Sequence, residues 1–138
     1  MERKIVLASH HRLAAGLKDT LDFITNGMAD VIALTAYLDN QPVEEQVQAL
    51  MTSFDDETEV VVLTDMTAGS VNQKFFAFRN RPHTQIISGM NLPLALGFAM
   101  EPFNDYLQTE RIKSLIEQAQ AEITYVNDIQ PEIDDDDE

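Results

Sequence analysis

The segment EVVVLT at residues 59–64, followed directly by Asp65, decides the fold. A continuous run of β-branched and aliphatic residues, without alternating polar positions, is typical of a strand that is buried on both faces of a sheet. The segment KIVLA at 4–8 has the same character, and β-rich runs also occupy 30–37 and 84–88. Strands of this kind belong to parallel sheets whose two faces are covered by helices.

Helical patterns alternate with these strands. Residues 12–26 repeat apolar side chains every three or four positions and end at Gly27, and further helices are expected after Pro42 and at 71–80, 92–100 and 109–123. This alternation predicts a doubly wound α/β fold with a mainly parallel sheet in the order 2-1-3-4. Residues 124–133 are interpreted as a short final strand.

Composition excludes several classes of protein. Nine Lys and Arg residues against 24 Asp and Glu residues give a net charge of −15, which disfavours binding to nucleic acid or to an anionic membrane surface. The chain has no cysteine, so disulfides, thiolate metal sites and cysteine nucleophiles are excluded. It also has no signal-peptide core and no apolar segment of the ~20 residues that cross a bilayer. We expect a cytoplasmic protein with one domain at 1–126 and an acidic tail at 127–138.

The predicted strand order brings two distant segments together. In doubly wound sheets, ligands bind beyond the carboxyl ends of the strands, at the point where the strand order reverses. In this order, that point lies between the first strand, which leads into SHHR at 9–12, and the third strand, which leads into DMTAGS at 65–70. We therefore expect His10 and Asp65 to face each other.

A histidine paired with a carboxylate is suited to accepting a phosphoryl group. The carboxylate fixes the tautomer, leaves the second ring nitrogen with an outward lone pair, and stabilises the positive charge that develops during attack. Thr67, Gly69 and Ser70 add hydroxyl and backbone groups at the start of the third helix, where N–H groups favour an anion. The sequence predicts a transiently phosphorylated histidine that needs no metal or organic cofactor.

Three motifs resemble the EIIA component of the mannose-class (mannose/fructose/sorbose) sugar phosphotransferase system. They are ASH at 8–10, LTD at 63–65 with AGS at 68–70, and SGMNLPL at 88–94, and the resemblance extends from about residue 3 to residue 125. It implies a phosphotransferase that accepts a phosphoryl group from phospho-HPr and passes it to an EIIB component for sugar uptake. It also implies a homodimer that exchanges a C-terminal strand, with membrane contact only through the permease components.

The same resemblance assigns roles by position. His10 is expected to accept the phosphoryl group on Nε2, and Asp65 to hold Nδ1. Ser70 and Thr67 are expected to hydrogen-bond the phosphoryl oxygens, with Gly69 lining the same loop. His11 and Arg12, which follow the histidine, receive no assigned role.

Other functions remain open at this point. An EIIA-like subunit of a dihydroxyacetone kinase system would use the same histidine, and a regulatory binding module would use its phosphorylation to change an interface. Receiver and flavodoxin domains lack support, because the first strand is followed by neither an acidic pair nor a phosphate loop. A hydrolase built from Ser70, His10 and Asp65 would lack the Gly-x-Ser-x-Gly elbow. The simplest structural alternative is that His10 and Asp65 only cap local turns.

Overall fold

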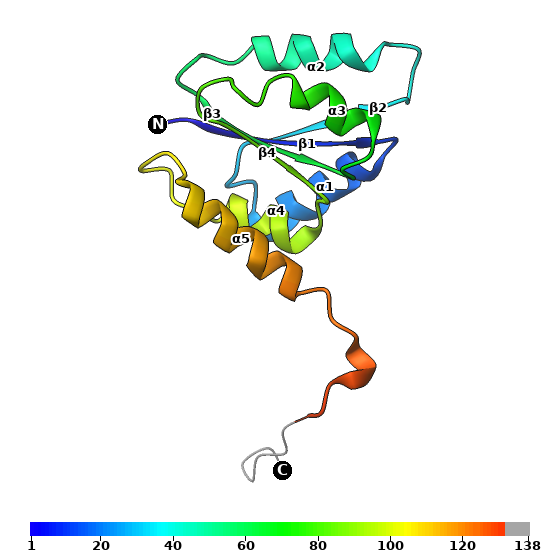
Figure 1. The fold of residues 1–138 in the computed structure, drawn as a ribbon, viewed down its shortest axis with the longest axis vertical. Coiled ribbons are helices and arrows are strands. Elements are labelled where there is room, and N and C mark those ends of the chain that lie inside the picture. The colour runs from blue at the N-terminus through cyan, green and yellow to red at the C-terminus, as the bar shows by residue number, and fades with distance from the viewer. Residues whose placement is uncertain (132–138) are drawn as a thin grey trace.

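A computed structural model describes residues 1–131 as a four-stranded sheet between two layers of helices (Figure 1). The strands are β1 (Arg3–His10), β2 (Val31–Ala36), β3 (Glu59–Thr64) and β4 (Thr84–Ser88). They pair in parallel in the order β2-β1-β3-β4, with His10 opposite Ala36 and Ala8 opposite Thr64. The predicted doubly wound sheet and its strand order are confirmed.

The helices lie on the two faces of this sheet. Helices α2 (Val43–Thr52) and α3 (Ser70–Phe76) cover one face, and α1 (Leu13–Thr25), α4 (Leu92–Ala99) and α5 (Thr109–Ala121) cover the other (Figure 1). Local sequence sets several of their ends. The side chain of Asn91 caps α4 by accepting the Leu94 amide at 2.9 Å, and α1 ends where Asn26 adopts a left-handed conformation.

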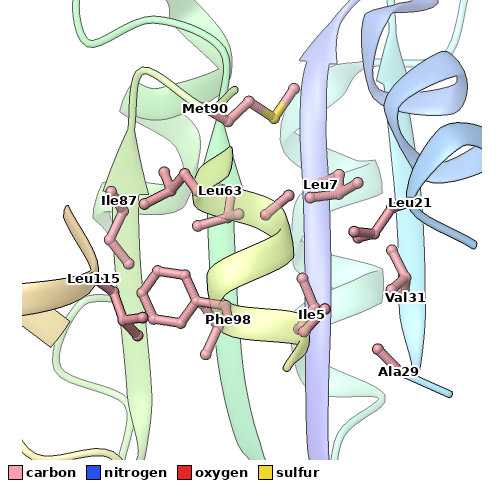
Figure 2. Packing of buried hydrophobic residues seen from close by; sticks show 14 of the residues in the cluster. Ile5, Leu7, Leu21, Ala29, Val31, Leu63, Ile87, Met90, Phe98 and Leu115 are labelled. Atoms are coloured by element: carbon pink, nitrogen blue, oxygen red, sulfur yellow. The ribbon is translucent and has the colours of Figure 1, made fainter. Parts of the chain in front are cut away.

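Two apolar clusters hold the helices to the sheet. Odd-numbered residues of β1 and β3 pack against α1, α4 and α5, and even-numbered residues pack against α2 and α3. Figure 2 shows the first cluster, in which Phe98 of α4 lies between Leu115 of α5 and Ile5 of β1. Every residue of β3 is buried, as expected for a strand covered on both faces. This packing holds the strands in place, so that the positions of their ends relative to one another are fixed.

A buried ion pair closes the amino-terminal end of the sheet. The side chains of Arg3 and Glu59 are 0% and 1% exposed, and Arg3 Nε donates to Glu59 Oε1 at 2.5 Å. The loop between α4 and α5 completes this cluster, because the Leu107 amide donates to Glu59 Oε2 at 2.7 Å. Arg3 also donates to three carbonyl oxygens of that loop, those of Glu101, Pro102 and Asp105. The pair therefore anchors the loop to the end of the sheet opposite His10.

The single chain forms no strand in residues 124–131, and the expected exchange of a C-terminal strand between two copies stays a prediction. Residues 124–131 contain a short 3₁₀ helix, Val126–Asp128, and no strand, and they extend away from the sheet (Figure 1). A strand needs a neighbouring strand to satisfy its backbone groups, and here the segment lies beside none. The acidic run at 132–138, with the end of the predicted strand, lies outside the described residues. Among residues 1–131, no helix combines the length and the apolar character needed to cross a bilayer.

Candidate functional site

The expected pair of His10 and Asp65 lies at the carboxyl edge of the sheet. His10 ends β1 and Asp65 directly follows β3, so the two neighbouring parallel strands deliver both side chains to one point. His10 Nδ1 lies 2.7 Å from Asp65 Oδ2, and the His10 amide donates to the same oxygen at 2.8 Å. The Met66 amide donates to Oδ1 at 3.0 Å. Three nitrogen groups thus fix the orientation of the carboxylate.

These hydrogen bonds keep Asp65 ionised. The side chain is only 10% exposed, and this burial raises the pKa of its carboxyl group, but the backbone and side-chain hydrogen bonds of His10 outweigh burial and leave the pKa below the usual 3.8. An ionised carboxylate can only accept, so Nδ1 carries the proton in this contact, and in a neutral imidazole Nε2 then has the lone pair. With 38% of the His10 side chain exposed, the ring is accessible to another molecule.

Two hydroxyl groups lie beside Nε2. Ser70 begins α3, and its Oγ lies 3.4 Å from His10 Nε2. Tyr37 directly follows β2 and stacks on the imidazole, with ring centroids 5.4 Å apart and planes inclined by 24°. The Tyr37 hydroxyl lies 2.5 Å from Ser70 Oγ. Ser70 is where the sequence placed it, whereas Tyr37 was expected only as the last residue of a strand.

Gly69 contributes space beneath the ring. It is buried, and a Cβ at this position would lie 2.8 Å from His10 Cε1 and 2.9 Å from Met66 Cγ. Its amide donates to the Met66 carbonyl at 3.2 Å, so that amide is already engaged within the loop. The absence of a side chain at Gly69 therefore lets the loop approach the imidazole closely.

The side chain of Thr67 links the loop between β3 and α3 to β4 and makes no hydrogen bond with the imidazole. Its hydroxyl hydrogen-bonds Ser88 at the end of β4. Asn72, which sequence reasoning missed, links the same loop to β3, since it accepts from Thr64 Oγ1 at 2.9 Å and donates to the Thr67 carbonyl at 3.1 Å. The loop between β3 and α3 is thereby tied to two strands as well as to His10.

The residues after His10 form a tight turn between β1 and α1. His11 is exposed with φ 55°, and its amide donates to the Ala36 carbonyl at 2.8 Å. Arg12 is exposed immediately before α1. Within residues 1–131, no three side chains of metal-binding type gather into a candidate metal site.

The fold and the site together define a class of α/β protein that presents a carboxylate-paired histidine at the point where the order of a parallel sheet reverses. Residues 4–120 match the profile of the EIIA-man family, described as the fructose IIA component of the phosphotransferase system (PTS). A proposed phosphoenolpyruvate-dependent sugar PTS permease from Klebsiella pneumoniae is 35% identical, with 93% of each chain covered and a TM-score of 0.86. This chain therefore belongs to the EIIA-man family of sugar PTS components.

More distant structures share the fold. The PTS IIA protein associated with the fucose utilization operon of Streptococcus pneumoniae is 25% identical, with a TM-score of 0.73 over 92% of this chain and 95% of its own. The mannose/sorbose-specific IIA subunit from Enterococcus faecalis is 20% identical, with a TM-score of 0.77 over 97% of this chain and 100% of its own. No curated protein sequence gives a significant match.

Proposed function

We propose that this chain carries a phosphoryl group on His10 Nε2, which it accepts from phospho-HPr and passes to an EIIB component during sugar uptake. The observation that carries the proposal is the 2.7 Å contact between His10 Nδ1 and Asp65, at the exposed edge of a PTS-family fold. This contact leaves Nε2 as the free nucleophile of the pair. A cytoplasmic location is part of the same proposal.

In the first transfer, the lone pair of His10 Nε2 forms a bond to phosphorus. The bond between phosphorus and the donor nitrogen breaks, and its electron pair stays with the donor. Nδ1 keeps its proton throughout, so the phosphorylated ring becomes cationic and the adjacent carboxylate of Asp65 compensates that charge. In the second transfer, the acceptor forms the new bond to phosphorus and His10 leaves as a neutral imidazole.

The loop between β3 and α3 is suited to receive the phosphoryl oxygens. Ser70 Oγ, at 3.4 Å from Nε2, is close enough to hydrogen-bond an oxygen of a group attached to that nitrogen. Gly69, which has no side chain, leaves room for the imidazole of His10, and Thr67 links the loop to Ser88 of β4. Nitrogen-to-nitrogen transfer needs only this alignment and stabilised oxygens, with no metal or organic cofactor.

Exposed apolar side chains near the site favour docking of protein partners. Leu13, Leu38 and Met66 are all exposed, and each lies on a segment that begins or ends at the carboxyl edge of the sheet. Transfer between two proteins needs a surface that excludes water around the phosphoryl group, because water would otherwise hydrolyse it. We assign phospho-HPr and the EIIB component to this face.

The end of the chain supports the proposed homodimer. Ile123, Tyr125, Val126 and Ile129 are all exposed in a segment that leaves the single chain after α5. Several exposed apolar residues in one short segment are unfavourable in water unless another surface covers them. A second copy that accepts this segment, as in the expected strand exchange, would cover them.

Phosphorylation from purified components tests the proposed function. The protein is incubated with labelled phosphoenolpyruvate, enzyme I and HPr, and compared with His10→Ala and with His11→Ala as the matched control. We expect an acid-labile label on the wild type and on His11→Ala, and none on His10→Ala. Label that persists in His10→Ala would overturn the site, and an unlabelled wild type would overturn the function. Addition of an EIIB component should then remove the label.

A further inference from the structure

Tyr37 makes two separate contacts in the site. Its ring lies against the imidazole of His10, and its hydroxyl lies 2.5 Å from Ser70 Oγ, which in turn lies 3.4 Å from His10 Nε2. These contacts join the ends of β2, β1 and the start of α3, three segments that are distant in the sequence. The result is a chain of hydroxyl groups that ends at the nitrogen proposed to carry the phosphoryl group.

The backbone holds Tyr37 in this place. β2 ends at Ala36, opposite His10, and Tyr37 has φ 66°, a left-handed conformation that an aromatic residue rarely adopts. The His11 amide donates to the Ala36 carbonyl at 2.8 Å and so secures the same turn. An extended Tyr37 would continue the strand. With the left-handed conformation, the chain turns at Tyr37, and the Tyr37 ring stacks on the imidazole of His10 on the neighbouring strand.

The chemistry of the two hydroxyls sets the direction of their hydrogen bond. A phenol, with a pKa near 10, is a stronger acid and a better donor than an aliphatic alcohol. This difference favours Tyr37 as the donor to Ser70 Oγ, in which case the single proton of Ser70 points toward His10 Nε2 or toward an oxygen bound there. A hydroxyl that accepts one hydrogen bond also becomes a stronger donor in the next.

We propose that Tyr37 is a positioning residue for phosphoryl transfer, which acts through Ser70 by directing the serine proton to the phosphoryl oxygens and acts on His10 by stacking. This inference rests on the proposed function. In the resting site, the serine proton faces Nε2. When the Nε2–phosphorus bond forms, the same proton turns to a phosphoryl oxygen while Tyr37 keeps its own bond to Ser70. No bond of Tyr37 breaks in the reaction.

Single-turnover transfer from phospho-HPr tests the hydroxyl of Tyr37. The Tyr37→Phe variant keeps the ring and loses one hydrogen bond, so we expect about a threefold to tenfold lower rate constant with an unchanged melting temperature. Tyr106→Phe is the matched control, since Tyr106 also stacks on a histidine, His83, and also hydrogen-bonds a neighbour, the Glu57 carbonyl. Both of these partners directly or closely precede strands, so Tyr106 lies at the end of the sheet opposite the site. We expect that control to transfer at the wild-type rate.

A double-mutant cycle shows whether Tyr37 acts through Ser70. In a Ser70→Ala background, the Tyr37→Phe change should have no further effect on the rate constant, because the group that it orients is absent. Equal losses in both backgrounds would overturn the coupling to Ser70. A wild-type rate in Tyr37→Phe, with a wild type that is normally phosphorylated, would overturn the inference while the proposed function stands.

The stacking contact has a readout that needs no phosphoryl donor. A tyrosine ring against an imidazole shifts the NMR resonances of the imidazole C–H protons. We expect Tyr37→Leu to move the His10 resonances toward those of a free histidine, whereas Tyr37→Phe leaves them nearly in place. Unmoved His10 resonances in Tyr37→Leu would refute the stack. A wild type that accepts no phosphoryl group would remove the proposed function and the role of Tyr37 in it together.

Discussion

The Gly69→Ala substitution tests whether the imidazole of His10 needs the space that the missing side chain of Gly69 leaves. The added Cβ would lie 2.8 Å from His10 Cε1 and 2.9 Å from Met66 Cγ, about 1 Å inside an ordinary contact between carbon atoms. The exposed Met66 side chain can rotate away. The imidazole is held by its 2.7 Å contact with Asp65, and we expect the substitution to displace the ring and lengthen that contact.

The expected cost falls on transfer more than on folding. Gly69 has φ −80° and ψ 154°, which alanine adopts without strain, so the loss of chain entropy on folding becomes smaller by about 0.4–1 kcal/mol. Overpacking opposes this gain by about 1–3 kcal/mol. The net effect is a destabilisation of about 0–2.6 kcal/mol. A displacement approaching 1 Å at the reacting nitrogen lowers the rate constant by about 100-fold.

Rapid-quench measurement of transfer from phospho-HPr, combined with urea unfolding, separates the two effects. Gly16→Ala is the matched control, because Gly16 lies inside α1 and a Cβ there meets nothing within 4 Å. That control should be about 1 kcal/mol more stable than the wild type and should transfer normally. A folded Gly69→Ala protein that transfers within about twofold of the wild-type rate would refute the steric reasoning.

Three further predictions concern ionised groups. Asp65→Asn keeps the shape of the side chain but removes its charge, so the rate constant of transfer should fall by about 100-fold or more in the same assay. Because the pKa of Asp65 is lowered in the folded protein, its stabilisation is present above the unfolded pKa and lost as the pH falls through the folded value. Urea unfolding at several pH values should therefore show a steeper loss below about pH 4 in the wild type than in Asp65→Asn, and equal slopes would contradict this. Glu59→Gln leaves Arg3 buried without a counter-charge and should cost about 3–5 kcal/mol in urea unfolding, whereas Asp30→Asn, at an exposed ion pair, should cost far less.

The centre of the sheet was predictable because both faces of β1 and β3 are buried. Continuous apolar runs gave the bounds of β3 and β4 as the structure has them, and gave β1 and β2 within two residues at each end. The contact between His10 and Asp65 followed from strand order alone, since the register of a parallel sheet brings successive carboxyl ends to one edge. Neither prediction required a side-chain conformation.

Tyr37 could not be found by the same reasoning. Aromatic residues favour strands and rarely adopt a positive φ, so the local pattern continued the strand through Tyr37. The missing signal was the register, which sets Ala36 opposite His10 and hence places the next residue beside the imidazole. The final strand is absent from the single chain for a related reason. Its local pattern is strand-like, but a strand forms only where a partner strand is present, and the described part of the single chain offers none to residues 124–131.

A phosphocarrier must accept a group and also give it up, and the surroundings of Asp65 suit both steps. The carboxylate receives hydrogen bonds from the His10 amide and ring and from the Met66 amide, and its pKa is lower than usual. A carboxylate with a low pKa is a weak base, so it does not remove the proton from Nδ1. In the proposed transfer, the phosphorylated ring therefore stays cationic and departs as a neutral imidazole, which is a far better leaving group than an imidazolate.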